Sequence, residues 1–164
     1  MTLVRVNKDN LDEYEEFIKK HPKGLFQHSS KWAKVKSAWK FEAIMLKNDS
    51  GEIKGSAAVL IRSIPIIKNS LMYCCRGFVC DENDFDTFDK LFNGLIELGK
   101  EYKAYCIKID PEIVIQNEAY KKHLIESGFI ELNPGCMDFE NVQPRFVYCF
   151  DYNDMNEDEL MLTF

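Results

Sequence analysis

The pattern of apolar and polar residues divides the chain into amphipathic helices and short strands. Apolar residues recur every third or fourth position at 10–20, 81–100 and 117–127, which predicts three helices. A fourth helix is predicted from Ser29 or Ser30 to about Trp39, since serine is a favoured cap for a first helical turn. Apolar or alternating runs predict strands at 3–6, 41–46, 53–65, 70–75, 104–109, 129–132 and 145–150.

The order of these elements indicates the fold class. Asn48-Asp49-Ser50-Gly51 is a turn signal that joins the second and third strands as a hairpin. Three strands run as a meander, and the later strands alternate with helices. This order predicts an α/β fold, with one mixed sheet covered by helices on both faces. A length of 164 residues suits a single domain.

Composition adds little to the prediction of the fold but disfavours some cellular locations. The chain is 46% hydrophobic and 29% charged, which is typical of a soluble globular domain. No apolar run approaches the roughly 18 residues that span a bilayer, so no integral membrane segment is expected. The N-terminus mixes acidic residues into its first turns and has no apolar signal core. The expected location is therefore the cytoplasm.

Charge is distributed unevenly along the chain. Residues 1–70 hold 13 Lys/Arg and 8 Asp/Glu, whereas residues 71–164 hold 8 and 19. The overall charge of −6 disfavours a long nucleic-acid duplex as the partner of the whole surface. A small anionic ligand on the N-terminal half remains compatible with this pattern.

The cysteines and histidines do not form a recognisable metal or disulfide pattern. None of the six cysteines forms a CxxC pair, and most lie in strand-like runs, which predicts reduced, buried thiols. His21, His28 and His123 are scattered without metal-ligand spacing. We therefore expect neither a metal nor a Cys–His nucleophile.

One basic side chain stands out in the segment at 25–41, which reads LFQHSSKWAKVKSAWKF. On a helical wheel, Lys36 lies about 40° from Trp32, at the border of an apolar stripe. Its stem can cover the indole while its ammonium reaches the rim of a cleft. The spacing leaves two interpretations open: a solvated lysine without a ligand, which the pattern favours, or an anchor for a phosphate or carboxylate.

Four motifs follow one another along the chain. They are F-Q-x-S-x-x-W-A-x-V-K at 26–36, I-x-G-S-x-x-V-L-I-R-x-I-P at 53–65, L-M-Y-x-x-R-G-x-V-C-D at 71–81, and YKAYCIKIDPEI at 102–113. In this order and approximate spacing they resemble the first half of the Fem family, the peptidoglycan-bridge aminoacyltransferases of Gram-positive bacteria. The resemblance covers nearly the whole chain. Cys75 and Phe78 depart from it, because the family tends to have prolines there.

The resemblance implies a fold, a domain organisation and a reaction. Fem proteins contain two GNAT-like domains, so residues 1–150 are expected to form the first, and 151–164 a connector and the start of a helix that leads to a second. The family transfers an amino acid from aminoacyl-tRNA to the stem peptide of a muramyl-peptide cell-wall precursor. The tRNA contacts are expected mainly in the second domain, no cofactor is expected, and this chain alone is expected to be inactive.

The resemblance also implies roles for individual residues. Lys36 matches the lysine that contacts the precursor diphosphate, and Arg76 is either a second phosphate contact or a structural arginine of the glycine turn. Asp110 matches an aspartate near the precursor that is a candidate general base, although an aspartate before proline is also a common helix cap, which we favour over catalysis. Tyr105 is a further candidate for substrate binding, although the pattern favours a core tyrosine.

Two other functions remain open from the sequence. A non-catalytic ligand-binding domain would share this fold and Lys36. An acetyl-CoA-dependent N-acetyltransferase would need a Q/R-x-x-G-x-G/A loop whose backbone N–H groups cradle a pyrophosphate, and the eight glycines form no such run.

Overall fold

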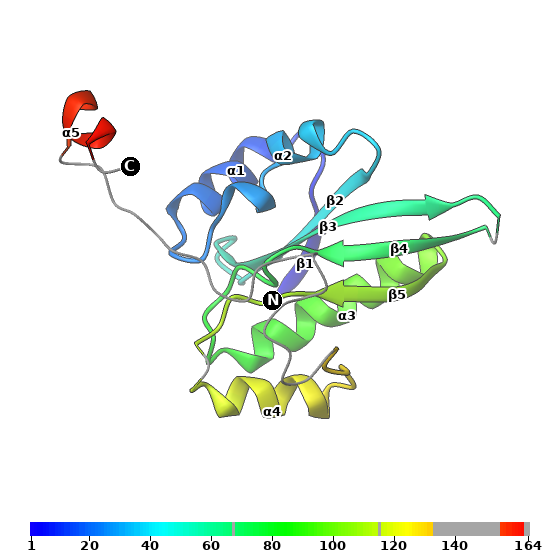
Figure 1. Ribbon diagram of the computed structural model, residues 1–164. Helices are drawn as coiled ribbons and strands as arrows, with labels where there is room; N and C mark the ends of the chain where they lie inside the picture. The colour runs from blue at the N-terminus through cyan, green and yellow to red at the C-terminus, as the bar shows by residue number, and fades with distance from the viewer. Residues whose placement is uncertain (67, 115, 133–154, 163–164) are drawn as a thin grey trace. The chain divides into compact units, whose positions relative to one another are not determined.

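The computed structural model describes residues 1–66, 68–114, 116–132 and 155–162 (Figure 1). The chain divides into two compact units, Met1–His123 and Leu124–Phe164. The elements are β1 (Thr2–Arg5), α1 (Leu11–Lys20), the 3-10 helix η1 (Phe26–His28), α2 (Ser30–Val35), β2 (Lys40–Lys47), β3 (Ile53–Ile64), β4 (Asn69–Cys74), α3 (Phe85–Glu101), β5 (Ala104–Ile109), α4 (Glu118–Glu126) and α5 (Glu157–Met161). Helix α5 lies in the second unit.

One five-stranded sheet forms the centre of the first unit, with the strand order β1-β2-β3-β4-β5. The first four strands are antiparallel neighbours, and β5 pairs with β4 in parallel. A parallel pair needs a long crossover connection, and here α3 provides it. The mixed sheet expected from the order of elements is therefore confirmed.

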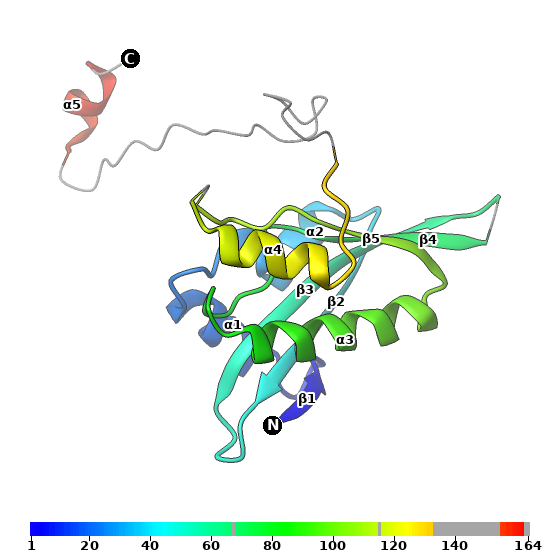
Figure 2. The same cartoon turned by 90° about the horizontal axis from the view of Figure 1, so that it is seen from below.

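Helices cover both faces of this sheet, as the sequence predicts (Figures 1 and 2). On one face, Tyr14 and Ile18 of α1 form a buried cluster with Ala43, Met45 and Ala58 of β2 and β3. The intervening strand residues point to the other face because side chains alternate along a strand.

The second face is covered by α3 at close range. A Cβ atom placed at Gly94 of α3 would lie 2.6 Å from Cδ1 of Ile44, so glycine allows the helix to approach β2 closely. Further along the helix, a Cβ at Gly99 would make ordinary contacts with Met72 and Ile107 of β4 and β5. The helix therefore packs across several strands of the sheet.

The predicted helix after Ser29 is confirmed at its start but is shorter than expected. The Ser29 side chain accepts a hydrogen bond from the backbone N–H of Lys31 (3.1 Å) and caps α2. The helix ends at Val35, not at about Trp39. Lys40 already pairs with Ile61 in the sheet, so the backbone must become extended before that residue. Lys36 is consequently the C-terminal cap of α2.

The segment after α4 also differs from the expectation. Gly128 adopts a φ of 90° and ends the helix as predicted, with its N–H bonded to the Ile125 carbonyl (3.0 Å). However, 129–132 is not a strand, and Ile130 is 85% exposed. An alternating run forms a strand only where another strand completes its hydrogen bonds. The strand predicted at 145–150 lies outside the described residues.

The predicted reduced thiols are confirmed in part. Cys74, Cys75 and Cys80 are buried free thiols, whereas Cys106 is exposed. The part of the chain that the structure describes contains no cluster of potential metal ligands, and none of its helices is long and apolar enough to cross a membrane.

A charged network joins β1, β2 and the end of α3. Glu42 is 8% exposed, and its carboxylate accepts hydrogen bonds from Arg5 Nε (2.8 Å) and Tyr102 Oη (2.5 Å). Burial alone would raise the pKa of Glu42, but the hydrogen bonds from Arg5, Tyr102 and Lys40 outweigh it and lower the pKa to about 2. Arg5 also pairs with Glu101 at the end of α3 (3.0 Å).

We predict that Glu42→Gln destabilises the protein at pH 7 by up to about 3 kcal/mol, because one pKa unit corresponds to about 1.4 kcal/mol. The depressed pKa means that this contribution is present above the ordinary glutamate value of 4.5 and is lost as the pH falls toward 2. Urea denaturation of both proteins at pH 7 and pH 3 measures it. An equal stability difference at both pH values would contradict the prediction.

Candidate functional site

The most distinctive backbone geometry lies where β4 ends. Arg76 and Gly77 both adopt positive φ values, 58° and 75°, so the chain turns sharply after Cys75. The backbone N–H of Arg76 donates a hydrogen bond to Oδ1 of Asp110 (2.8 Å). Because β4 and β5 are parallel, their carboxyl ends meet at one edge of the sheet, where α/β proteins commonly bind ligands.

Asp110 supports this turn with one oxygen and leaves the other without a partner. Its Oδ2 is buried and has no hydrogen-bond partner among the described residues. Burial raises the pKa of Asp110, although the hydrogen bond from Arg76 opposes the rise. The predicted helix cap at this position is wrong, because residues 111–114 are not helical and α4 begins only at Glu118. Asp110 binds the neighbouring turn instead.

A buried histidine lies under the same turn. His28 is 1% exposed, and its Nδ1 accepts the backbone N–H of Leu25 (3.0 Å), so the ring proton is on Nε2. Burial lowers the pKa of His28 to about 4. The backbone carbonyl groups of Cys75 and Gly77 raise this pKa and so partly oppose the effect of burial. His28 is therefore neutral at pH 7 and packs η1 against the Arg76 turn. Tyr14 of α1 also donates to the His28 carbonyl (2.6 Å).

Helix α2 brings Lys36 to this region. Glu15 of α1 accepts hydrogen bonds from the Ser29 hydroxyl and the Ser30 N–H, both at 2.8 Å, which anchors the start of α2. At the other end, Nζ of Lys36 lies 5.0 Å from the centre of the Trp32 ring. The lysine thus lies along the indole, as the helical wheel predicts, and its side chain is exposed.

The charges of Lys36 and Arg76 act on the same buried thiol. Burial raises the pKa of Cys75, and the positive charges of Arg76 and Lys36 both act in the opposite direction. Arg76 follows Cys75 directly in the chain, and Lys36 acts on it from the C-terminal cap of α2. Such an arrangement attracts an anionic group, for which lysine provides a point charge and arginine a directional donor.

Tyr105 does not belong to this group of residues. It lies at a register irregularity in β5, where Ser70 pairs with Ala104 but Leu71 pairs with Cys106. The predicted core position is wrong, because Tyr105 is 55% exposed. Asp110 is five positions further along the chain, a distance of roughly 16 Å. The structure thus joins Arg76 to Asp110, places Lys36 along Trp32 at the end of α2, and leaves Tyr105 apart.

Two further residues of this region carry no signal in the sequence. Tyr73 of β4 lies beside Asp110 and Cys75; burial and the nearby Asp110 raise its pKa well above the ordinary value. Tyr73 sits inside an apolar strand run, and His28 occupies a variable position of its motif, so neither carries a sequence signal. Parallel pairing of β4 with β5, which places Tyr73 opposite Lys108, would have been the only clue.

Comparison with known proteins identifies the family. The model of the FemAB family matches residues 10–164. This chain belongs to the FemAB family. The resemblance carried by the four motifs is thereby confirmed.

Individual relatives support the assignment. The chain is 33% identical over 157 residues to lipid II:glycine glycyltransferase of Staphylococcus epidermidis, and 31% identical over 160 residues to the Staphylococcus aureus protein of that name. Each alignment covers 93% of this chain but 37% of the relative. This FemAB chain therefore spans little more than a third of the length of these curated relatives.

Solved structures confirm the GNAT-like fold. A crystal structure of FemX matches with a TM-score of 0.69 and 30% identity, covering 78% of this chain and 32% of that one. A probable acetyltransferase matches with a TM-score of 0.60 and 13% identity, covering 92% and 99%. At that identity the second likeness concerns the fold alone.

We predict that Gly77→Ala destabilises the FemAB chain more than Gly51→Ala does. Both glycines have positive φ, at 75° and 85°, so each alanine costs about 1 kcal/mol of backbone strain. Only at Gly77 would the new Cβ lie 2.9 Å from Pro111, the residue after Asp110, which adds about 1–2 kcal/mol. Denaturant titrations of the two variants measure the difference. An equal loss of stability in the two variants would show that a Cβ atom at position 77 does not clash with Pro111.

Proposed function

We propose that this chain is part of a peptidoglycan-bridge aminoacyltransferase, which transfers an amino acid from aminoacyl-tRNA to the stem peptide of a muramyl-peptide precursor. The observation that carries the proposal is membership of the FemAB family, whose relatives at 31% and 33% identity are named lipid II:glycine glycyltransferases. The precursor is accordingly proposed to be lipid-linked.

The proposed reaction is an acyl transfer between an ester and an amine. The stem-peptide amine attacks the ester carbonyl of the charged tRNA. A new C–N amide bond forms, the ester C–O bond breaks, and the terminal ribose hydroxyl leaves. The amine loses a proton, so a base that receives this proton assists the step.

The anionic part of the precursor is proposed to bind between Lys36 and Arg76. The charges of both side chains act on the Cys75 thiol, although Lys36 is the C-terminal cap of α2 and Arg76 lies in the turn after β4. A diphosphate placed there would gain an ammonium on one side and a guanidinium on the other. The Trp32 indole under the lysine stem limits the conformations that the ammonium can take, which reduces the entropy lost on binding.

Asp110 is proposed to contribute through both of its oxygens. Oδ1 holds the Arg76 turn, and Oδ2 is the oxygen without a partner. The raised pKa makes this carboxylate a stronger base, which suits a group that receives the amine proton. Tyr105 is proposed as a more distant contact for the precursor, because its side chain is exposed on the edge of β5.

The domain organisation is part of the proposal. Residues 1–150 would form the first GNAT-like domain, and 151–164 a connector that leads to a second domain. Aminoacyl-tRNA would bind mainly to that second domain and meet the precursor between the two. Use of aminoacyl-tRNA as donor would place the reaction in the cytoplasm.

The alternative function, an acetyl-CoA-dependent N-acetyltransferase, is less well supported than the aminoacyltransferase. The reason lies at the start of α3, the helix that follows the meander. A pyrophosphate site at a helix start uses free backbone N–H groups and a positive dipole end. At α3 the Asp84 side chain already accepts the N–H of Thr87 (3.0 Å), and Asp81 and Glu82 add negative charge just before it. An increase in melting temperature with acetyl-CoA would restore this alternative.

We predict that Lys36→Ala weakens binding of a nucleotide-linked muramyl peptide, whose diphosphate stands in for that of the lipid-linked precursor, by about tenfold, the effect of losing about 1.4 kcal/mol. Isothermal titration with the 164-residue chain measures the dissociation constant. Lys34→Ala is the matched control, because Lys34 is an exposed lysine of the same helix, on its far side. Identical affinities of wild type and Lys36→Ala would remove Lys36 from the site.

We also predict that the 164-residue chain alone forms no aminoacylated product. The reason is that the donor tRNA and the acceptor would meet between two domains, and this chain supplies one. Incubation with charged tRNA and the precursor, followed by mass spectrometry of the peptide, measures the product. Ready turnover by this chain would contradict the two-domain proposal while leaving the precursor site intact.

A further inference from the structure

The β3–β4 hairpin carries an apolar tip that is exposed to solvent. The hairpin extends beyond the other strands in both views of the molecule (Figures 1 and 2). At its end, Pro65 is exposed and Ile66 is 94% exposed, the largest exposure of any large apolar side chain in the part of the chain that is described. Isolated exposed apolar residues are common, so the surroundings of Ile66 decide whether this tip is meaningful.

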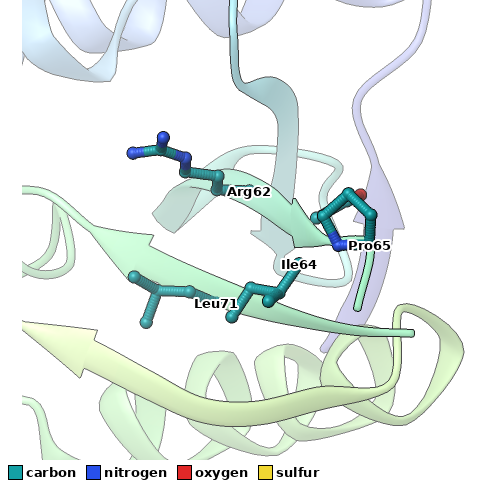
Figure 3. A pocket seen from close by; sticks show the side chains of 5 residues that line it. Arg62, Ile64, Pro65 and Leu71 are labelled. Carbon is teal, nitrogen blue, oxygen red and sulfur yellow. The ribbon is translucent and has the colours of Figure 1, made fainter. Parts of the chain in front are cut away.

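Those surroundings are themselves apolar. Arg62 pairs with Leu71 across the ladder, and Ile64 lies two residues from Arg62 on the same strand face. With Ser63 and Pro65 these side chains line a hollow of about 350 Å³ at the base of the tip (Figure 3). The hairpin therefore adds the apolar side chains of Ile64, Pro65 and Leu71 to the exposed Ile66 that follows them at the tip.

Basic and aromatic side chains adjoin this surface. The Arg62 guanidinium lies 5.7 Å from the centre of the Trp39 ring, which connects the hairpin to the segment after α2. Residues 60–72, from Leu60 of β3 to Met72 of β4, contain Arg62 and Lys68 and no Asp/Glu. Lys40 pairs with Ile61 in the sheet and so adjoins the hairpin, although its ammonium is paired with Glu42 (3.1 Å). An apolar tip that carries two cationic side chains, has no carboxylate of its own and adjoins a tryptophan has the composition of a membrane-interface contact.

We infer that the β3–β4 hairpin tip docks on the surface of an anionic lipid bilayer, with Pro65 and Ile66 entering the headgroup region and with Trp39 and Arg62 at the level of the lipid phosphates. The apolar tip favours a bilayer over RNA, because a phosphate backbone offers no partner for exposed isoleucine. The inference stands apart from the proposed function, since vesicle binding requires neither the precursor nor tRNA.

Co-sedimentation of the 164-residue chain with lipid vesicles tests this inference. We expect binding to vesicles of phosphatidylcholine with phosphatidylglycerol to exceed binding to phosphatidylcholine alone, and to fall as salt is added. Ile66→Glu is expected to lower the partition onto the anionic vesicles by about tenfold, because it removes the apolar insertion and adds a repelled charge. Its exposure means that the fold is not expected to change.

Val114→Glu is the matched control, because it introduces the same charge at a side chain that is 62% exposed. Val114 follows the carboxyl end of β5, whereas the hairpin tip lies near the amino end of that strand. It is expected to bind the vesicles like the wild type. Arg62→Gln is expected to weaken binding to the anionic vesicles about fivefold and to leave binding to neutral vesicles unchanged.

Three results would overturn the inference. The first is equal vesicle binding by Ile66→Glu and the wild type. The second is an equal loss in Val114→Glu, which would indicate a general charge effect. The third is binding to structured RNA that Ile66→Glu and Arg62→Gln reduce while vesicle binding is absent, which would assign the surface to nucleic acid.

Discussion

The hydrogen bond between the Arg76 backbone N–H and Oδ1 of Asp110 joins two segments that are 34 residues apart in the chain. It forms because β4 and β5 run in parallel, so that both strands deliver their carboxyl ends to the same edge. A positive φ is costly for Arg76 in an isolated chain but not for Gly77, and this hydrogen bond, with the contact between Gly77 and Pro111, compensates for that cost. The position of the Arg76 side chain depends on this hydrogen bond and on the contact between Gly77 and Pro111.

The candidate site also depends on a second layer of the fold. Helix α2 has only six residues and would be unstable alone, so its placement comes from tertiary contacts. Glu15 holds its start, and His28 packs the preceding turn of η1 under the Arg76 turn. Lys36, at the C-terminal cap of α2, is therefore held by a helix whose start α1 anchors and whose end β2 limits. A ligand between Lys36 and Arg76 would connect two elements that are distant from each other in the sequence.

Charges serve two different purposes in this molecule. Where they are buried, they are paired: Glu42 accepts hydrogen bonds from Arg5 and Tyr102, and its pKa is low because these partners outweigh burial. The β3–β4 hairpin carries Arg62 and Lys68 and has no Asp/Glu between Leu60 and Met72. Pairing stabilises the fold in the first case, and the excess of cations over carboxylates gives the hairpin a positive surface for an anionic partner in the second.

The sequence alone determined the elements whose signals are local. Helical periodicity, the Ser29 cap, the turn at Gly128 and the order of strands and helices predicted most of the architecture, and four motifs with their spacing indicated the family. Tertiary structure decided the rest. Helix α2 stops at Val35 because Lys40 must pair with Ile61, Tyr105 is exposed because the β4–β5 register shifts beside it, and Asp110 binds a turn instead of capping a helix. Each of these outcomes depends on a partner distant in sequence, and no local pattern of side chains records which strand will lie alongside.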